Sequence, residues 1–227
     1  MTKKCVSCFS GGADSFAISV IMKHRGYKVY PIVFIYGQKG AKEVEVAENL
    51  AAKAGFERPV KLMIGGDVAH IWKGNQLIDE EVEVMDRFNP NSIVPVRNAI
   101  FLSFATSYAL NIGAEAVCYG GVLNEFLYPD CRAKFAEIFE QLVDYGHSPV
   151  GVKKLRIISP ATEGLARHEL FKMAYEIVGD LIFETWSCLR SGEKQCGACL
   201  NCISRHDGFV KAGIEDRTDY LRKFGDG

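Results

Sequence analysis

The sequence predicts an α/β protein built on a parallel sheet. Short runs rich in β-branched and aromatic residues alternate with longer runs of helical period along most of the 227 residues, which is typical of βαβ units. Hydrophobic residues make up 48% and charged residues 24% of the chain, and this composition excludes a disordered or fibrous protein. A chain of this length forms an ordinary domain whose core needs no disulfides.

Five strands and five helices follow from these periods. The strands are expected near residues 4–9, 29–35, 60–64, 115–119 and 155–158, and the helices near residues 14–25, 42–54, 98–111, 132–145 and 166–178. Glycines such as Gly26 and Gly55 follow several of the helices, where a left-handed residue ends the last turn. Two stretches fit neither period, namely residues 65–92 and the chain after Trp186.

Charge and hydropathy favour a small-molecule partner. The 27 Lys and Arg nearly balance the 28 Asp and Glu, giving a formal charge of -1, so no overall field attracts nucleic acid or an anionic membrane. We find no apolar stretch near the roughly 18 residues of a membrane span and no signal peptide, and expect a cytoplasmic protein without membrane contact. In that compartment, clustered thiols indicate a metal or catalysis rather than disulfides.

The first motif with chemical meaning is Ser10-Gly11-Gly12-Ala13-Asp14-Ser15, between the first strand and the first helix. Adjacent glycines let the backbone turn tightly and bring its N–H groups against an anion, and the helix start adds unpaired donors and its dipole. The motif therefore predicts a phosphate cradle. The alternative is a plain turn in which Asp14 or Ser15 only caps the helix.

This motif resembles the PP-loop of the N-type ATP pyrophosphatases, which cleave ATP to AMP and pyrophosphate while adenylating an acceptor oxygen. The resemblance implies a Rossmann-like domain of the adenine nucleotide alpha hydrolase type. It also implies ATP and Mg²⁺ as cofactors, with the departing pyrophosphate held by residues 10–15.

The second motif is a C-x7-C-x2-C-x2-C pattern formed by Cys188, Cys196, Cys199 and Cys202. Four thiolates at this spacing can enclose one tetrahedral Zn²⁺, although an iron–sulfur cluster also takes four and free cysteines can be buried as small hydrophobes. We favour structural Zn²⁺, because a closed shell of thiolates leaves no position for substrate. We therefore expect a PP-loop domain over residues 1–185 and a zinc-binding segment over residues 186–227 packed on it.

An N-terminal PP-loop with a C-terminal four-Cys segment resembles the 7-cyano-7-deazaguanine synthase family over nearly the whole chain. Three further segments match this family, namely Phe34-Ile35-Tyr36-Gly37-Gln38, Val94-Pro95-Val96-Arg97-Asn98 and Tyr128-Pro129-Asp130-Cys131-Arg132. The first and third follow expected strands, and ligands of a doubly wound sheet lie beyond the carboxyl ends of its strands.

The resemblance assigns roles to these residues. Asp14 orients Mg²⁺, and Arg97 and Arg132 neutralise phosphate or carboxylate, which makes these three the catalytic candidates. The nucleotide-binding residues are Ser10, Gly11, Gly12, Ala13, Asp14, Ser15, Tyr36, Gln38, Arg97 and Asn98, and the substrate-binding residues are Glu125, Tyr128, Asp130 and Arg132.

Simpler interpretations stay open for several of these side chains. Arg97 can pair with Asp86 or Glu83 at the surface. Asn98 and Asp130 can cap a helix.

The implied activity is that of an ATP-dependent carbon–nitrogen ligase in a homodimer. Adenylation of the carboxylate of 7-carboxy-7-deazaguanine is followed by ammonia attack to the amide and then by conversion to the nitrile. One alternative is a relative that stops at the amide or joins the activated deazaguanine to another amine, such as one on a protein partner. Another is a tRNA-modifying PP-loop enzyme, although the balanced charge and the lack of a basic appended domain stand against it.

Departures from the family pattern bear on nitrile formation more than on adenylation. Ala13 stands where the family has Gln, and Val96 where it has Gly. Arg167-His168-Glu169 replaces Lys-Ala-Glu, which suggests that a phosphate-contacting lysine is missing. His168 is one replacement for that contact, although a solvated histidine on a helix is the more usual case. Residues 188–191 lack the family's Cys-Tyr-Asn-Gly, and the loop over residues 120–129 is shorter.

Overall fold

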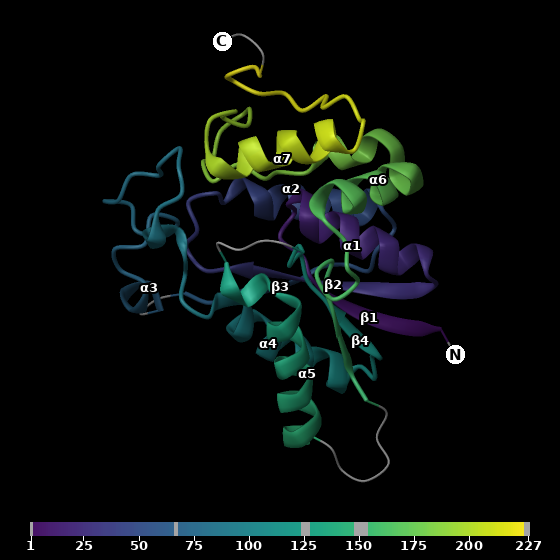
Figure 1. The fold of residues 1–227 in the computed structure, drawn as a ribbon. Coiled ribbons are helices and arrows are strands. Elements are labelled where there is room, and N and C mark those ends of the chain that lie inside the picture. Colours follow the sequence, from purple (N-terminus) through teal and green to yellow (C-terminus); the bar gives the residue numbers. More distant parts are fainter. Residues whose placement is uncertain (1, 66–67, 124–127, 148–153, 225–227) are drawn as a thin grey trace.

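The computed structural model describes residues 2–65, 68–123, 128–147 and 154–224 (Figure 1). In these residues, five strands form one parallel sheet in the order β3-β2-β1-β4-β5. The strands are β1 (Lys3–Cys8), β2 (Tyr27–Ile35), β3 (Val60–Met63), β4 (Ala116–Cys118) and β5 (Arg156–Ile158). This arrangement confirms the expected α/β class.

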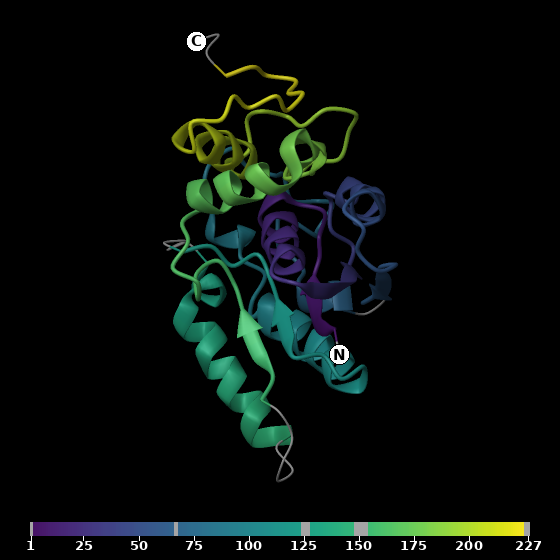
Figure 2. The ribbon, with the colours of Figure 1, turned by 90° about the vertical axis from the view of Figure 1, so that its right-hand side faces the viewer.

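Helices cover both faces of the sheet (Figures 1 and 2). On one side lie α1 (Ala13–His24), α2 (Lys42–Lys53), α6 (Arg167–Val178) and α7 (Leu200–Lys211), and on the other lie α4 (Arg97–Asn111) and α5 (Ala133–His147). α6 packs on α1 and α7 packs on α6, so that α7 forms an outer layer. Short turns of helix complete the fold, namely α3 (Val68–Ile71), η1 (Pro90–Ser92), η2 (Pro129–Cys131) and η3 (Gly179–Glu184).

The alternation of side chains along the strands creates two cores. Cys5 and Val6 are adjacent in β1 and fully buried, but Cys5 belongs to the core under α1 and Val6 to the core under α4, because successive residues of a strand face opposite ways. Both faces of the parallel sheet are covered in this way, which explains the apolar residues on both sides of the central strands β1, β2 and β4.

β1 is the strand at which the chain changes direction across the sheet. β2 pairs on one side of β1 and β4 on the other. At such a switch point the loops that leave the strands diverge and open a crevice at their carboxyl ends. The turn that follows β1 is the glycine motif, and Gly120 follows β4 closely enough that an added Cβ would lie 3.0 Å from the Ser15 nitrogen. The fold thus opens a crevice beside the predicted phosphate cradle.

The expectation that the chain has no apolar stretch near the length of a membrane span is corrected. The segment Pro90–Asn111 is long and apolar enough, with a mean hydropathy of 1.3, to pass as a membrane span by length and composition. A core helix passes the same test, and α4 itself has 15 residues, about 22 Å against the ~30 Å of a bilayer core. Leu102, Ala105 and Ala109 are buried in the core on this face of the sheet, so α4 here is a sheet-packing helix.

The C-terminal segment shares the main core. Phe209 of α7 packs on Phe171 of α6, with ring centroids 4.6 Å apart. A smaller cluster holds Trp186, Tyr220 and the buried cysteines. The division of the chain at residue 185 stays a prediction.

Candidate active site

A cavity of about 290 Å³ opens beyond the carboxyl ends of β1, β2 and β4. The glycine motif, the end of β2 and the first residues of α4 form one part of its wall. The segment after β4, the first residue of α6, residues 186–189 and the start of α7 form further parts. Segments from the whole length of the chain therefore meet at one site.

The glycine motif forms the turn that the sequence predicts. Gly11 has a φ of +89°, and any side chain there would strike the backbone carbonyl of Glu43 in α2. The Ser15 hydroxyl donates to the Gly12 carbonyl at 3.1 Å, and the Gly12 N–H donates to the Ser10 hydroxyl at 3.1 Å. α1 begins after Gly12, and no side chain of the described residues caps it. The turn is thus held by its own serines, and the helix start stays open to the cavity.

Asp14 lies in the first turn of α1 and pairs with Arg167 rather than capping its own helix. Arg167 donates from Nε to Asp14 Oδ1 at 3.1 Å and from Nη2 to Oδ2 at 3.2 Å. Both residues line the cavity, and about a quarter of each side chain is exposed. Since Arg167 opens α6, the first position of the replaced Lys-Ala-Glu segment still carries a cation. His168 does not line this cavity, which makes Arg167 the better candidate for the phosphate contact.

Arg97 lies at the opposite wall, at the start of α4. Its Nη1 donates to the Tyr36 hydroxyl at 3.1 Å, and its guanidinium lies 5.9 Å from the centroids of both the Tyr36 and Phe101 rings. The surface partner considered above, Asp86, pairs instead with Arg190 at 2.9 Å. The coulombic interaction with Tyr36 is the main cause that raises the pKa of Arg97, and it acts only at a pH high enough to ionise the phenol, so the guanidinium is charged throughout the neutral range.

Gln38 joins the end of β2 to α2. Its Nε2 donates to the Phe34 carbonyl at 3.0 Å and to Glu43 Oε1 at 3.1 Å, and its Oε1 accepts from the Tyr36 N–H at 2.9 Å. Glu43 lines the cavity beside it. Burial raises the pKa of the Glu43 carboxyl to about 7, against the smaller opposing effects of the Gln38 hydrogen bond and the Arg97 charge.

The other predicted substrate residues are spread more widely. Tyr128 lines the cavity, as does Asn98. Asp130 Oδ2 accepts from the Asn98 N–H at 3.1 Å, so Asp130 supports the start of α4 from outside the cavity wall. Arg132 is exposed and also lies outside that wall, and Glu125 lies outside the described residues. The binding roles of these residues stay predictions.

Val96 occupies a backbone conformation that suits glycine. It precedes α4 with a φ of +49°, which is unfavourable for a β-branched residue. Its side chain is 63% exposed, so little burial is lost on truncation.

We therefore expect Val96→Gly to stabilise the protein by about 0.5 to 1 kcal/mol, since relief of strain outweighs the entropy of glycine. Thermal unfolding should shift upward by roughly 1–4 °C. Val210→Gly, at an exposed position inside α7, is the control and should lower the midpoint. An unchanged or lower midpoint for Val96→Gly would show that the left-handed backbone costs nothing here.

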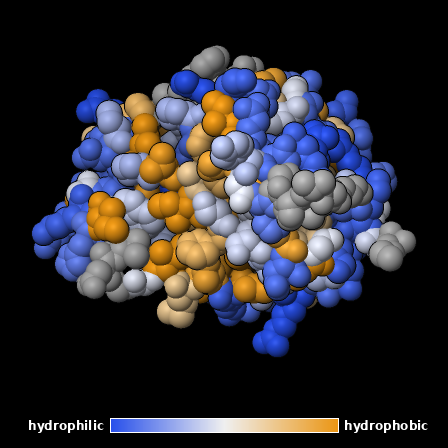
Figure 3. Space-filling model, turned by 90° about the horizontal axis from the view of Figure 1, so that it is seen from below, coloured by the Kyte–Doolittle hydropathy of each residue, from blue (hydrophilic) through white to orange (hydrophobic). Residues whose placement is uncertain are grey.

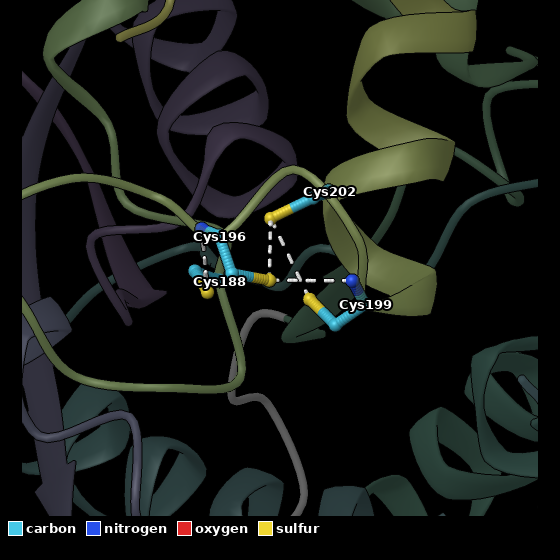
Figure 4. Close-up of side chains that lie close together, drawn as sticks. All are labelled: Cys188, Cys196, Cys199 and Cys202. Carbon is cyan, nitrogen blue, oxygen red and sulfur yellow. Dashed lines mark hydrogen bonds between the residues drawn. The ribbon is translucent and has the colours of Figure 1, made fainter. Parts of the chain in front are cut away.

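The four predicted metal ligands converge at the start of α7 (Figure 4). The sulfur atoms of Cys188, Cys196, Cys199 and Cys202 all lie within 4.8 Å of one another. The Sγ of Cys202 is 3.8 Å from that of Cys196 and 3.5 Å from that of Cys199. Tetrahedral Zn²⁺ with bonds of about 2.3 Å separates its sulfurs by about 3.8 Å, so this donor set fits the ion.

Backbone and side-chain N–H groups surround the sulfurs. Cys196 Sγ accepts from the Cys199 N–H at 3.2 Å and from Arg190 Nη1 at 3.2 Å. Cys188 Sγ accepts from the N–H groups of Arg190 and Cys196, each at 3.4 Å. Such donors stabilise thiolates and are typical outer partners of a metal site.

The cysteine segment is part of the cavity wall. The Trp186 N–H donates to the Gly11 carbonyl at 2.9 Å. An added Cβ on Gly40, just after β2, would lie 3.1 Å from the Cys188 carbonyl. The segment over residues 186–189 therefore lies against both the glycine motif and the loop after β2, and it ties the metal site to the cavity.

The fold and the site together define a PP-loop α/β protein with a cluster of four cysteines whose geometry suits a metal ion. The model of the family described as "Queuosine biosynthesis protein QueC" matches residues 4–213, and the chain belongs to this family.

Two relatives and one solved structure illustrate the likeness. The chain is 37% identical to the 7-cyano-7-deazaguanine synthase of Acetivibrio thermocellus over 97% of this chain and 99% of that one. It is 34% identical to the 7-cyano-7-deazaguanine synthase of Thermoplasma acidophilum over 96% of this chain and 92% of that one. A 4-thiouridine synthetase in complex with RNA and ATP aligns with a TM-score of 0.48 and 18% identity, over 93% of this chain and 50% of that one.

These comparisons confirm the family that the motifs indicate, and its class of ATP-dependent ligase. The relatives' names favour the synthase over both alternative activities.

Three charged residues line the cavity although the sequence predicts no role for them in the site. Arg167 belongs to a segment interpreted as a loss, and Glu43 looks like an ordinary acidic residue in the first turn of a helix. Arg205 lies in the unassigned C-terminal stretch but is 2% exposed, lines the cavity and donates to the Thr185 and Ser187 hydroxyls. A buried charged residue without a sequence pattern gives no local signal, so the fold alone reveals it.

Proposed function

We propose that this protein uses ATP to convert 7-carboxy-7-deazaguanine into 7-cyano-7-deazaguanine by way of the amide. A carboxylate resists attack by an amine because its oxygen is a poor leaving group, and adenylation removes that obstacle. The observation that carries the proposal is the single cavity that brings an open glycine turn together with Arg97 and Arg167. Such a cavity can hold a nucleotide and a second anion side by side.

Each group of cavity residues has a separate role in the proposed reaction. The N–H groups of residues 11–15 donate hydrogen bonds to the departing pyrophosphate, and Arg167 exchanges Asp14 for a phosphate oxygen. Asp14, released in this way, is the candidate that holds Mg²⁺, which supplies charge neutralisation on the phosphates. Arg97 binds phosphate or the substrate carboxylate while Tyr36 holds its guanidinium in place.

Product analysis tests this function. The purified protein is given ATP, ammonium and 7-carboxy-7-deazaguanine, and mass spectrometry should find the nitrile together with two AMP for each nitrile formed. Accumulation of the amide alone would place the end point one step earlier, and transfer to a protein amine would appear as a mass increase on that protein. Release of ADP in place of AMP would contradict the proposal.

We also propose that the four thiolates hold one structural Zn²⁺. The sulfur separations fit Zn²⁺, and a closed shell of four protein ligands leaves no position for substrate. Elemental analysis should give one equivalent of zinc, whereas iron with labile sulfide would identify a cluster instead.

The proposed assembly is a cytoplasmic homodimer. Four large apolar residues on α4 and α5 are exposed, namely Phe104, Ile138, Leu142 and Tyr145, and apolar side chains form a band across this underside of the molecule (Figure 3). A contiguous apolar surface marks a contact with another protein, and a second copy of the chain is the partner that we propose. Light scattering at micromolar concentration should give the mass of a dimer for the wild type and that of a monomer for Leu142→Glu.

A further inference from the structure

Amide formation in the proposed function requires a proton acceptor. Nitrogen that attacks an acyl-adenylate gains positive charge, and the adduct reverts unless a proton leaves it. Two carboxylates among the described residues line the cavity, those of Asp14 and Glu43, and no histidine of the described residues does. Asp14 pairs with Arg167 through both carboxylate oxygens, and in the proposed function it holds Mg²⁺ once Arg167 binds phosphate, so it is engaged in either state. Glu43 is therefore the carboxylate available for this task.

The surroundings of Glu43 fix its position. Glu43 is the second residue of α2, and its backbone carbonyl packs directly against Gly11 of the glycine motif. Its side chain lines the same cavity as residues 12–15 of the glycine motif, and Gln38 donates to its Oε1 at 3.1 Å. Both N–H groups and the oxygen of the Gln38 carboxamide are engaged by the protein. Gln38 thus acts as a positioning residue that holds one oxygen of Glu43 beside the phosphate cradle.

The charged groups around Glu43 suit a carboxylate that gains and loses a proton near neutral pH. Arg97 of α4 favours the charged form, while burial opposes it more strongly and raises the pKa of Glu43 to about 7. The Tyr36 phenol, whose pKa burial raises, stays protonated beside Arg97. On α2 itself, Lys42 pairs with Glu45 at 2.8 Å.

We infer that the Glu43 carboxylate accepts the proton from the attacking nitrogen in the amide-forming step, an inference that rests on the proposed function. Ammonia forms the new C–N bond, and one N–H proton passes to a Glu43 oxygen. The C–O bond to AMP then breaks, and AMP leaves with the electron pair. The protonated Glu43 returns its proton to solvent before the next turnover.

The test separates adenylation from amination in Glu43→Gln. Exchange of labelled pyrophosphate into ATP, dependent on 7-carboxy-7-deazaguanine, reports the first step and should stay within about threefold of the wild type. Ammonia-dependent amide formation should fall by about 100-fold or more, the usual effect of losing a general base. Hydroxylamine is mostly neutral at pH 7 and a stronger nucleophile, so its hydroxamate should form at a rate near that of the wild type. Glu45→Gln, on the exposed side of α2, is the matched control.

The pH dependence of amide formation is an independent test of the role of Glu43. At constant free ammonia, wild-type amide formation should rise as the pH passes through about 7, because the ionised form of Glu43 is required. The same inflection should persist at a lower rate in Glu43→Asp and vanish in Glu43→Gln.

Two outcomes would overturn the role of Glu43, namely wild-type amide formation by Glu43→Gln or an equal loss of pyrophosphate exchange and amide formation. Absence of carboxylate-dependent exchange in the wild type would instead refute the proposed function itself.

Discussion

Replacement of Cys199 by serine is expected to yield metal-poor, largely insoluble protein. The four sulfurs lie within 4.8 Å of one another, so loss of one ligand breaks a strong bond and leaves three thiolates that repel each other. Structural zinc contributes on the order of 10 kcal/mol to folding, which is comparable to the whole stability of a domain. Because the same segment lies against Gly11 and Gly40, any soluble Cys199→Ser protein should also bind ATP poorly.

Metal content, soluble yield and ATP affinity measure this effect. Cys131→Ser is the control for metal content alone, since Cys131 is not one of the four clustered cysteines but does line the cavity, and its variant should keep one equivalent of metal. A soluble Cys199→Ser protein with a full equivalent of metal would show that the site does not depend on four thiolates.

Gly12→Val is expected to abolish AMP formation with little loss of folding stability. An added Cβ at Gly12 would lie 3.2 Å from the Ser10 hydroxyl and 3.4 Å from the Trp186 carbonyl. One carbon fits once the Ser10 side chain shifts by a few tenths of an ångström. We expect the two further methyl groups of valine to fill cavity space that the phosphates need, since Gly12 lines the cavity. Loss of preorganised donors at such a site lowers rates by about 100-fold or more. Gly12→Ala should be clearly milder.

Asp14→Ala is expected to lower AMP formation by a similar factor through loss of the Mg²⁺ position. The partly exposed Asp14–Arg167 pair contributes about 1 kcal/mol to stability, so the variant should stay folded. Glu163→Ala is the matched control. It removes an ion pair in which Arg25 Nη1 and Glu163 Oε2 lie 2.7 Å apart. Arg25 directly follows the C-terminal end of α1, far from the cavity. Equal activity of Asp14→Ala and Glu163→Ala would remove Asp14 from the site.

The sequence predicts the regular elements well because each has a clear period. All five expected strands and all five expected helices are present, within about three residues at their ends. The helix α7 is missed because its start, Cys199 to Cys202, is organised by the thiolate site rather than by an apolar stripe. The partner of Arg97 depends on tertiary packing, so proximity in sequence wrongly suggests Asp86, which Arg190 takes instead.

The residues of the candidate site also fall into those that a local sequence pattern predicts and those that only tertiary packing reveals. The glycine motif and the cysteines are local patterns whose spacing carries their chemistry, and the structure brings each set together. Glu43, Arg167 and Arg205 carry no such pattern. Their significance comes from the segments that fold around them, which no single window of sequence contains.

The hydrogen bond from Trp186 to Gly11 also sets the order in which the protein becomes competent during synthesis. The glycine motif leaves the ribosome well before the wall that closes over it, because that wall includes residues 186–189 and the start of α7. A nascent chain can thus build its sheet early, but it completes the nucleotide site only when the last cysteine has emerged. Translation that stops before that point releases a protein with an open, unfinished cavity.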